Sequence, residues 1–180
     1  AGQAVLIDAD TTNTQMGSSG TITVQRNAAA LPAAPEENIE INGVVSGSGD
    51  CTITATGSVL FNDAAADLTS GGGNVSITAD SNTSNVGALT MVDGATIDAG
   101  AGTITIIAYD DATVTGLSST QAPGVVTTLI SVSSTNGGIV DAGDMATDFT
   151  ASAGNARVVL SAATGIGSAA AVESETSYLD

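Results

Sequence analysis

Apolar and polar residues alternate along this chain in short runs. In the stretch "AGTITIIAYDDATVTG" (101–116), Ile104 and Ile106 would share one face of an extended segment, and Thr103 and Thr105 would share the other. β-branched residues favour strands, whereas the Gly, Asn and Asp residues between the runs favour turns. The pattern therefore predicts many short β-strands joined by tight turns, and no amphipathic helix.

The alternating phrase recurs at intervals in the middle twenties. Its copies are GTITV (20–24), CTITATG (51–57), NVSITAD (74–80), GALTMVD (87–93), GTITIIAYD (102–110), TLISVSS (128–134) and ARVVLSAATG (156–165). The central residues Ile53 and Ile77 lie 24 positions apart. Val132 follows Ile106 by 26 positions and precedes Leu160 by 28. Intervals of this size indicate a solenoid or another repeat array.

A second phrase also recurs, as ATIDAG (95–100) and GIVDAG (138–143), with Asp98 and Asp141 at the same place in each. We interpret it as a further part of the same irregular repeat. Two segments interrupt the repeat. The proline-containing segment 27–40 is predicted to be a protruding loop, and the segment 117–124, with one proline, a second loop.

Two architectures accommodate short, evenly spaced strands, and the aromatic content separates them. A β-sandwich needs a larger aromatic core than two Phe and two Tyr provide. A β-solenoid fills a narrow interior with Val, Ile, Leu and Ala. We therefore predict an all-β chain in which residues 1–180 form a single β-solenoid segment. It would have about seven coils of roughly 25 residues with irregular loops, and would form part of a longer array.

Charge and composition exclude several classes of function. The net charge is −17, and the two basic residues are Arg26 and Arg157. Nucleic acids and anionic membrane surfaces bind through clustered Lys and Arg, so neither is an expected partner. No apolar run has the length that membrane insertion requires. Without His or Lys, Ser-His-Asp catalysis and a phosphate-loop lysine are also excluded.

The single cysteine, Cys51, cannot form an internal disulfide. It shares its parity with Ile53, which places it inward as a small hydrophobic residue. We expect no cofactor and no catalytic residue in the chain. The sequence also offers short glycosylation patterns at Asn74 and Asn82.

The adjacent carboxylates Asp110 and Asp111 are the candidate metal ligands, because Ca²⁺ takes several oxygen ligands. The chain contains neither an EF-hand loop nor the glycine- and aspartate-rich nonapeptide of calcium-binding coils. Asp also favours turns by bonding to its own backbone. We therefore interpret the pair as a corner between two strands, with calcium binding as the alternative.

Three runs of sequence, IDAGAGTITIIAYDDATVTGLSST, STNGGIVDAG and VVLSAATGIGSAAAVESETSYLD, resemble the repeat coils of filamentous-haemagglutinin-like, β-strand-repeat secreted bacterial adhesins. The resemblance is clearest over residues 74–180. It implies a right-handed parallel β-helix, export to the cell surface, and a role in adhesion or in building a matrix or filament. It implies no catalytic residues.

The sequence thus predicts a non-catalytic structural segment of a secreted bacterial surface or extracellular-matrix protein, which stacks end to end with further repeats or other copies. The alternative is an adhesin that binds a surface glycan through the loops 27–40 and 117–124. A calcium-dependent polysaccharide lyase, with Arg26 or Arg157 as its base, is a third hypothesis that the absence of Lys and His disfavours.

Overall fold

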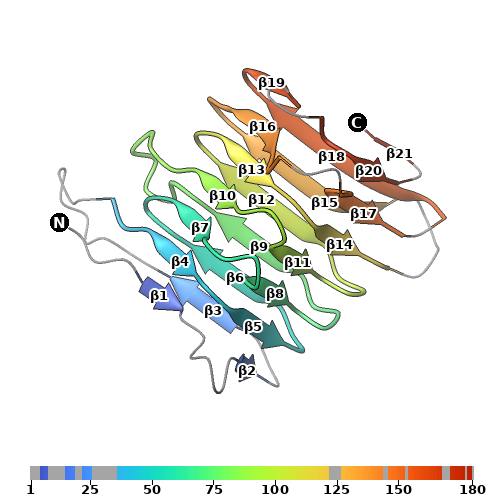
Figure 1. Ribbon diagram of the computed structural model, residues 1–180, viewed down its shortest axis with the longest axis horizontal. Coiled ribbons are helices and arrows are strands. Elements are labelled where there is room, and N and C mark those ends of the chain that lie inside the picture. Colours follow the sequence, from blue (N-terminus) through green and yellow to red (C-terminus); the bar gives the residue numbers. More distant parts are fainter. Residues whose placement is uncertain are drawn as a thin grey trace.

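The chain folds into a β-solenoid of three parallel sheets. The computed structural model describes residues 36–121, 127–143, 146–152, 154–167 and 171–176, together with the strand segments 5–7, 15–18, 22–25 and 178–179. Within these residues every regular element is a β-strand. Figure 1 shows the strands stacked in chain order, with β1, β2 and β3 at one end of the stack and β19, β20 and β21 at the opposite end.

Each sheet contains seven strands, and successive coils contribute one strand to each sheet in turn. Sheet A consists of β1 (Val5–Ile7), β4 (Ile39–Ile41), β7 (Val59–Phe61), β10 (Leu89–Met91), β13 (Ala112–Val114), β16 (Gly138–Asp141) and β19 (Gly165–Ile166). Sheet B consists of β2 (Gln15–Ser18), β5 (Val44–Gly47), β8 (Asp67–Thr69), β11 (Thr96–Asp98), β14 (Leu117–Ser119), β17 (Phe149–Ala151) and β20 (Ser174–Glu175). Sheet C consists of β3 (Ile22–Gln25), β6 (Cys51–Thr54), β9 (Val75–Thr78), β12 (Ile104–Ala108), β15 (Thr127–Ser134), β18 (Ala156–Ala162) and β21 (Tyr178–Leu179).

The register of sheet C confirms the repeat predicted from the sequence. Ile53 pairs with Ile77, and Val132 lies between Ile106 and Leu160 in parallel register. The intervals of 24, 26 and 28 residues are therefore the lengths of three of the coils. Six of the seven copies of the alternating phrase contribute their strands to this one sheet.

The remaining phrase assignments are wrong in detail. GALTMVD supplies β10 of sheet A, so it is not a copy of the sheet C phrase. ATIDAG supplies β11 of sheet B, whereas GIVDAG supplies β16 of sheet A. Asp98 and Asp141 therefore occupy different walls. Strands in all three walls alternate apolar and polar residues in the same way, so the sequence pattern alone cannot assign a strand to its wall.

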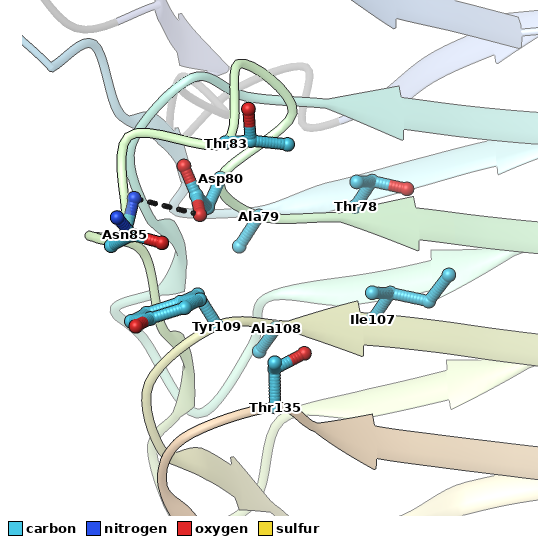
Figure 2. A pocket seen from close by; sticks show the side chains of 9 residues that line it. All are labelled: Thr78, Ala79, Asp80, Thr83, Asn85, Ile107, Ala108, Tyr109 and Thr135. Atoms are coloured by element: carbon cyan, nitrogen blue, oxygen red, sulfur yellow. Dashed lines mark hydrogen bonds between the residues drawn. The ribbon is translucent and has the colours of Figure 1, made fainter.

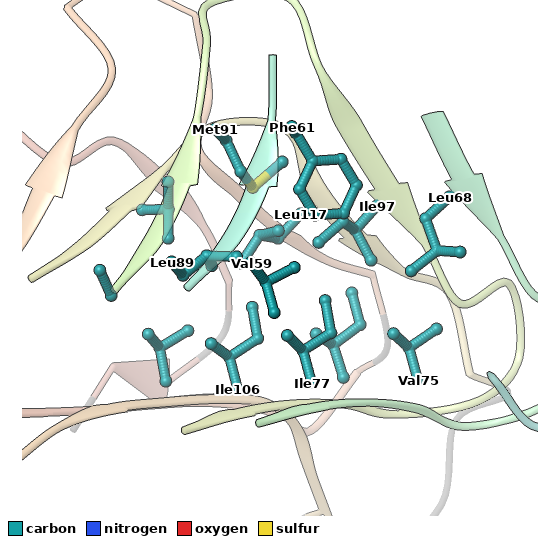
Figure 3. Packing of buried hydrophobic residues seen from close by; sticks show 14 of the residues in the cluster. Val59, Phe61, Leu68, Val75, Ile77, Leu89, Met91, Ile97, Ile106 and Leu117 are labelled. Atoms are coloured by element: carbon teal, nitrogen blue, oxygen red, sulfur yellow. The ribbon is translucent and has the colours of Figure 1, made fainter. Parts of the chain in front are cut away.

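The inward-facing residues of the three sheets form one narrow apolar core. Figure 3 shows Ile77 and Ile106 from sheet C pointing toward Val59 and Leu89 from sheet A. The largest fully buried side chains are Phe61, Phe149, Ile39, Ile41, Ile53, Leu68, Ile77, Leu89, Met91, Ile97, Ile104 and Ile106. Removal of these side chains from water supplies the main driving force for folding.

Cys51 lies in this core and is 1% exposed, as its parity predicted. Burial raises the pKa of its thiol to about 11, so the thiol stays protonated and behaves as a small hydrophobic group.

The outward positions on sheet C carry mostly hydroxyl-bearing side chains. Thr105 is half-buried, as predicted, and so are Thr52 and Thr54, which also alternate with buried neighbours. In sheet A, by contrast, Thr115 follows β13 at a corner and is only 3% exposed. Arg157 is half-buried between the buried residues Ala156 and Val158.

The predicted loops need correction at their ends. Residues 27–35 of the segment 27–40 lie outside the described residues, and the segment's last residues, Ile39 and Glu40, belong to β4. The segment 117–124 begins with a strand of sheet B, β14, and residues 122–124 lie outside the described residues. Leu117 is fully buried, so this part of the segment is wall and not a protruding loop.

A column of glycines lets the coils approach closely where sheet B turns into sheet C. A Cβ atom on Gly102 would lie 2.0 Å from the carbonyl oxygen of Gly73, and one on Gly73 would lie 2.2 Å from the carbonyl carbon of Gly49. Any side chain would force the stacked backbones apart at these positions. The glycine-rich turns of the sequence are thus required by the stacking of coils and not only by the turn itself.

The neighbouring residues Ile106 and Ile107 provide a direct test of the wall assignment. Ile106 is fully buried, whereas Ile107 is 45% exposed on the outer face of the same strand. We expect Ile106→Ala to lower the free energy of unfolding by about 3 kcal/mol, because it leaves a cavity in a closely packed core. Ile107→Ala should cost less than about 1 kcal/mol. Urea unfolding followed by circular dichroism measures both, and equal losses would contradict the assignment.

Candidate functional site

The Asp110–Asp111 pair lies at the corner between β12 and β13, as predicted. The two carboxylates bond to opposite neighbouring coils. Oδ2 of Asp110 accepts a hydrogen bond from the backbone N–H of Gly87, 3.2 Å away in the preceding coil. Oδ1 of Asp111 accepts one from the N–H of Gly138, 2.7 Å away in the following coil. The pair therefore fastens three successive coils at this corner, and calcium binding by it stays a prediction.

A different group of carboxylates converges near the C-terminal end of the solenoid. Asp141 is the last residue of β16 in sheet A, whereas Asp148 directly precedes β17 in sheet B. Glu173 directly precedes β20, the next strand of sheet B, and so occupies the position of Asp148 one coil later. Each of the three residues offers a carboxylate oxygen, and these oxygens lie within 4.8 Å of one another.

Backbone N–H groups hold one oxygen of each aspartate in this cluster. The N–H of Gly143 donates to Oδ1 of Asp141 at 2.9 Å, and the N–H of Glu173 donates to Oδ2 of Asp148 at 3.0 Å. The carbonyl oxygen of Glu173 accepts hydrogen bonds from the N–H groups of Asp148 and Phe149, each at 3.1 Å. These contacts fix the orientation of both aspartates and join the two coils.

The remaining oxygens of the cluster are buried without a hydrogen-bond partner. They are Oδ2 of Asp141, Oδ1 of Asp148 and Oε2 of Glu173. The Asp148 side chain is fully buried and Asp141 is 5% exposed. Buried polar atoms in proteins are normally paired, and a buried unpaired carboxylate oxygen costs free energy. Three carboxylates from adjoining coils therefore lie close together, and one oxygen of each accepts no hydrogen bond from the described residues.

Burial raises the pKa of Asp148 to about 7. The hydrogen bond from the Glu173 N–H lowers the pKa, while the neighbouring charges of Asp141 and Glu173 raise it. The native protein therefore resists ionisation of this carboxyl at neutral pH. The sequence pattern did not identify this cluster. Asp148 and Glu173 nevertheless lie 25 positions apart, which is one coil length, and each directly precedes a strand.

A shallow pocket of about 290 Å³ lies on the surface between sheets C and A (Figure 2). Its lining includes Tyr109, Ile107 and the start of the connection between β9 and β10. Three non-glycine residues of this connection, Asp80, Thr83 and Asn85, have left-handed backbone with φ of 61°, 58° and 71°. Such conformations are uncommon in non-glycine residues, although Asp and Asn adopt them more readily than most, and strained backbone clusters at functional sites.

The Asp80 carboxylate is occupied inside this connection. Its Oδ1 accepts hydrogen bonds from the N–H and Oγ of Ser84, and its Oδ2 accepts one from the N–H of Asn85 at 3.1 Å. These bonds hold the strained backbone in place beside the Tyr109 ring (Figure 2). The pocket thus combines an aromatic face with exposed polar groups and a preformed backbone.

No common site contains the other candidate residues, which are Asn74, Asn82 and Arg157. Asn74 is engaged in the wall, because its Oδ1 accepts hydrogen bonds from the N–H and Oγ1 of Thr103 in the next coil. Asn82 is exposed in the connection between β9 and β10. Arg157 lies in sheet C, away from the corner between sheets A and B that holds the carboxylates.

Comparison of the chain with protein-family models, curated proteins and solved structures returned no match. Within the described part of the chain, no helix has the length and hydropathy needed to cross a membrane.

The shifted pKa of Asp148 predicts a pH dependence of stability. Its folded-state pKa of about 7 exceeds the value near 4 expected in the unfolded chain, so its contribution to stability is full below pH ~4 and is lost as the pH rises through ~7. Asp148→Asn removes the charge and keeps an acceptor for the Glu173 N–H. In EDTA at pH 8 we expect the variant to be more stable than the wild type by about 2 kcal/mol.

Thermal and urea unfolding between pH 4 and pH 8 measures this difference, which should disappear near pH 4. Asp98→Asn is the matched control. Asp98 lies in the same Asp-Ala-Gly sequence as Asp141 and accepts the N–H of Gly100 at 2.8 Å, but it is not part of the carboxylate cluster. An Asp148→Asn variant that is less stable than the wild type at pH 8 would contradict the buried, unpartnered environment.

Proposed function

We propose that this chain is a non-catalytic structural segment of a secreted bacterial surface or extracellular-matrix protein, and that its coils stack end to end into a fibre. The β-solenoid fold supports this proposal, since its strands pair only with those of neighbouring coils. The acidic composition supports it as well, because a net charge of −17 keeps an extended polymer soluble through self-repulsion. The observation that carries the proposal lies at the C-terminal end of the solenoid.

The apolar core is left open at that end. Ile166 pairs with Ile139 in sheet A and so continues a column of inward-facing residues. Ile139 is fully buried, but Ile166 is 47% exposed. In sheet B, the exposed residue Ser174 likewise follows the fully buried Phe149. The columns of sheets A and B therefore both end in an exposed residue that a further coil would cover.

The strand edges at the same end offer backbone groups for pairing. β19, β20 and β21 contain two residues each, and β21 pairs with only Arg157 and Val158 of the seven-residue strand β18. Unpaired strand edges are templates for further strands. A coil of the same kind supplies both the missing backbone partners and an apolar cover in matching register.

We infer that the covering coil belongs either to a continuation of the same chain or to another copy of it. A head-to-tail contact between copies is heterologous and extends into an open filament. We propose about seven coils of roughly 25 residues, a number that the seven strands of each sheet support. A right-handed path follows from the strong preference of parallel crossovers for that hand. The secreted bacterial source rests on composition and on the resemblance to β-strand-repeat adhesins.

Two exposed isoleucines allow a matched test of end-to-end stacking. Ile166→Asp places a charge at the open end of the core, whereas Ile107→Asp places the same charge at a similarly exposed site on the outer face of sheet C. We expect the wild type and Ile107→Asp to form rods that lengthen with concentration, and Ile166→Asp to need at least ~tenfold higher concentration. Sedimentation velocity and negative-stain electron microscopy measure the assembly. Uniform short rods of wild type at every concentration, or equal assembly of both variants, would overturn the proposal.

The surface pocket favours a second candidate function, an adhesin that binds a surface glycan. Sugar rings stack on aromatic side chains and hydrogen-bond to nearby polar groups, and Tyr109, Thr83 and Thr135 provide both kinds of contact. The site differs from the loops that the sequence suggested. If the chain is an adhesin, Tyr109→Ala should reduce binding on a glycan array by more than ~tenfold without changing the unfolding midpoint. Undiminished glycan binding by this variant would exclude the pocket.

A further inference from the structure

We propose that Asp141, Asp148 and Glu173 bind one hard divalent cation, with Ca²⁺ as the ion that fits best, and that this ion joins two successive coils. The inference does not depend on the fibre proposal. It begins from the convergence of three carboxylates on one point at the corner between sheets A and B.

The spacing of the oxygens suits a single ion. Ca²⁺ binds oxygen at about 2.3–2.6 Å, so two ligands on opposite sides of the ion lie at most about 5 Å apart. The three carboxylates offer oxygens that lie within 4.8 Å of one another. One ion can therefore contact all three residues without rearrangement of the backbone.

The unpartnered oxygens are the independent sign of a ligand. Oδ2 of Asp141, Oδ1 of Asp148 and Oε2 of Glu173 are buried and accept no hydrogen bond. A cation placed among them would satisfy all three and would neutralise carboxylates that otherwise repel one another. These oxygens would act as ligands of the ion, and the ion would remove the repulsion between the carboxylates.

The outer shell of a metal site is also present. The N–H groups of Gly143 and Glu173 each hold one oxygen of an aspartate, and the other oxygen of each aspartate is buried without a hydrogen bond. Such outer contacts orient ligands before the ion arrives and strengthen binding.

The chemistry of the donors identifies the class of ion. All three ligands are carboxylates, and the cluster contains no imidazole or thiolate, so hard cations are preferred over Zn²⁺ or copper. Mg²⁺ demands near-ideal octahedral geometry and retains several waters, whereas Ca²⁺ accepts irregular carboxylate sites. A buried and irregular set from three strand ends therefore favours Ca²⁺.

The position of the ligands gives the ion a structural role. Asp141 and Asp148 flank the turn from β16 to β17, whereas Glu173 comes from the following coil. That coil contains the two-residue strands β19 and β20, which make few backbone bonds of their own. Bound Ca²⁺ would therefore fasten the least paired coil to the coil before it.

Calcium titration of chelator-treated protein at pH 8 tests the site. Isothermal titration calorimetry with CaCl₂ should give one ion per chain, and the midpoint of thermal unfolding should rise with the calcium concentration. Hydrogen exchange in residues 171–176 should slow on addition of calcium. Asp148→Asn should weaken binding by more than ~tenfold while remaining folded, which its unfolding curve in EDTA verifies.

Two control variants locate the binding. Asp98→Asn alters the same Asp-Ala-Gly turn outside the cluster and should bind calcium as the wild type does. The double variant Asp110→Asn/Asp111→Asn should also bind normally. No binding at millimolar calcium, full binding by Asp148→Asn, or loss of binding only in the double variant would overturn the proposal. Binding of MgCl₂ as tight as that of CaCl₂ would overturn the assignment of the ion.

Discussion

Parallel backbone pairing between coils is the interaction on which the rest of this structure depends. The N–H of Val75 reaches the carbonyl oxygen of Thr103 at 2.7 Å, and the N–H of Ile97 reaches that of Gly116 at 3.0 Å. Each such bond joins residues one coil apart, so no coil satisfies its own strands. The pairing fixes the register, and the register fixes which residues face inward. The core that results consists mostly of small and branched side chains, with Phe61 and Phe149 as its aromatic members.

At the corners between walls, side chains pair with backbone groups that the strand ladders leave without a partner. Where the chain turns, backbone groups leave the ladder and need other partners. Asn74 serves this purpose in one corner, since its N–H donates to Asp50 of the preceding coil and its side chain accepts from Thr103 of the following one. Asp110 and Asp111 do the same in another corner. The carboxylate cluster departs from this rule, because part of each side chain has nothing to accept from. Asn42 also has an unpaired oxygen at a corner between sheets A and B, so it is the convergence of three carboxylates that distinguishes this cluster.

The features that depend on the local alternation of apolar and polar residues could be predicted from the sequence. The period of two placed Ile53, Ile77 and Cys51 inward, and the spacing of similar phrases gave the coil length. It could not assign strands to walls, because Leu89 and Ile77 occupy the same pattern in different sheets. Alternation also fails at a corner, where the chain changes direction, and Thr115 is buried there although Val114 before it is buried too.

The cluster itself could not be predicted from alternation. Asp148 and Glu173 become neighbours only through the stacking of coils, and Asp141 joins them only across a corner. A search for acidic residues separated by one coil length and directly followed by a strand would have paired Asp148 with Glu173. Knowledge of the register is needed to add the third ligand.

The two features at the C-terminal end follow from a single property of stacked coils. In an array where each repeat contacts only its neighbours, stability is the sum of each repeat and its interfaces, so a terminal coil with one interface is the least stable. Ile166 is 47% exposed in the last coil that the structure describes, and Glu173 belongs to the same coil. A cation between Asp148 and Glu173 would act on the one remaining interface, whereas a further coil would create the missing one. Cation binding and the stacking of a further coil would therefore stabilise the same coil through two different interfaces.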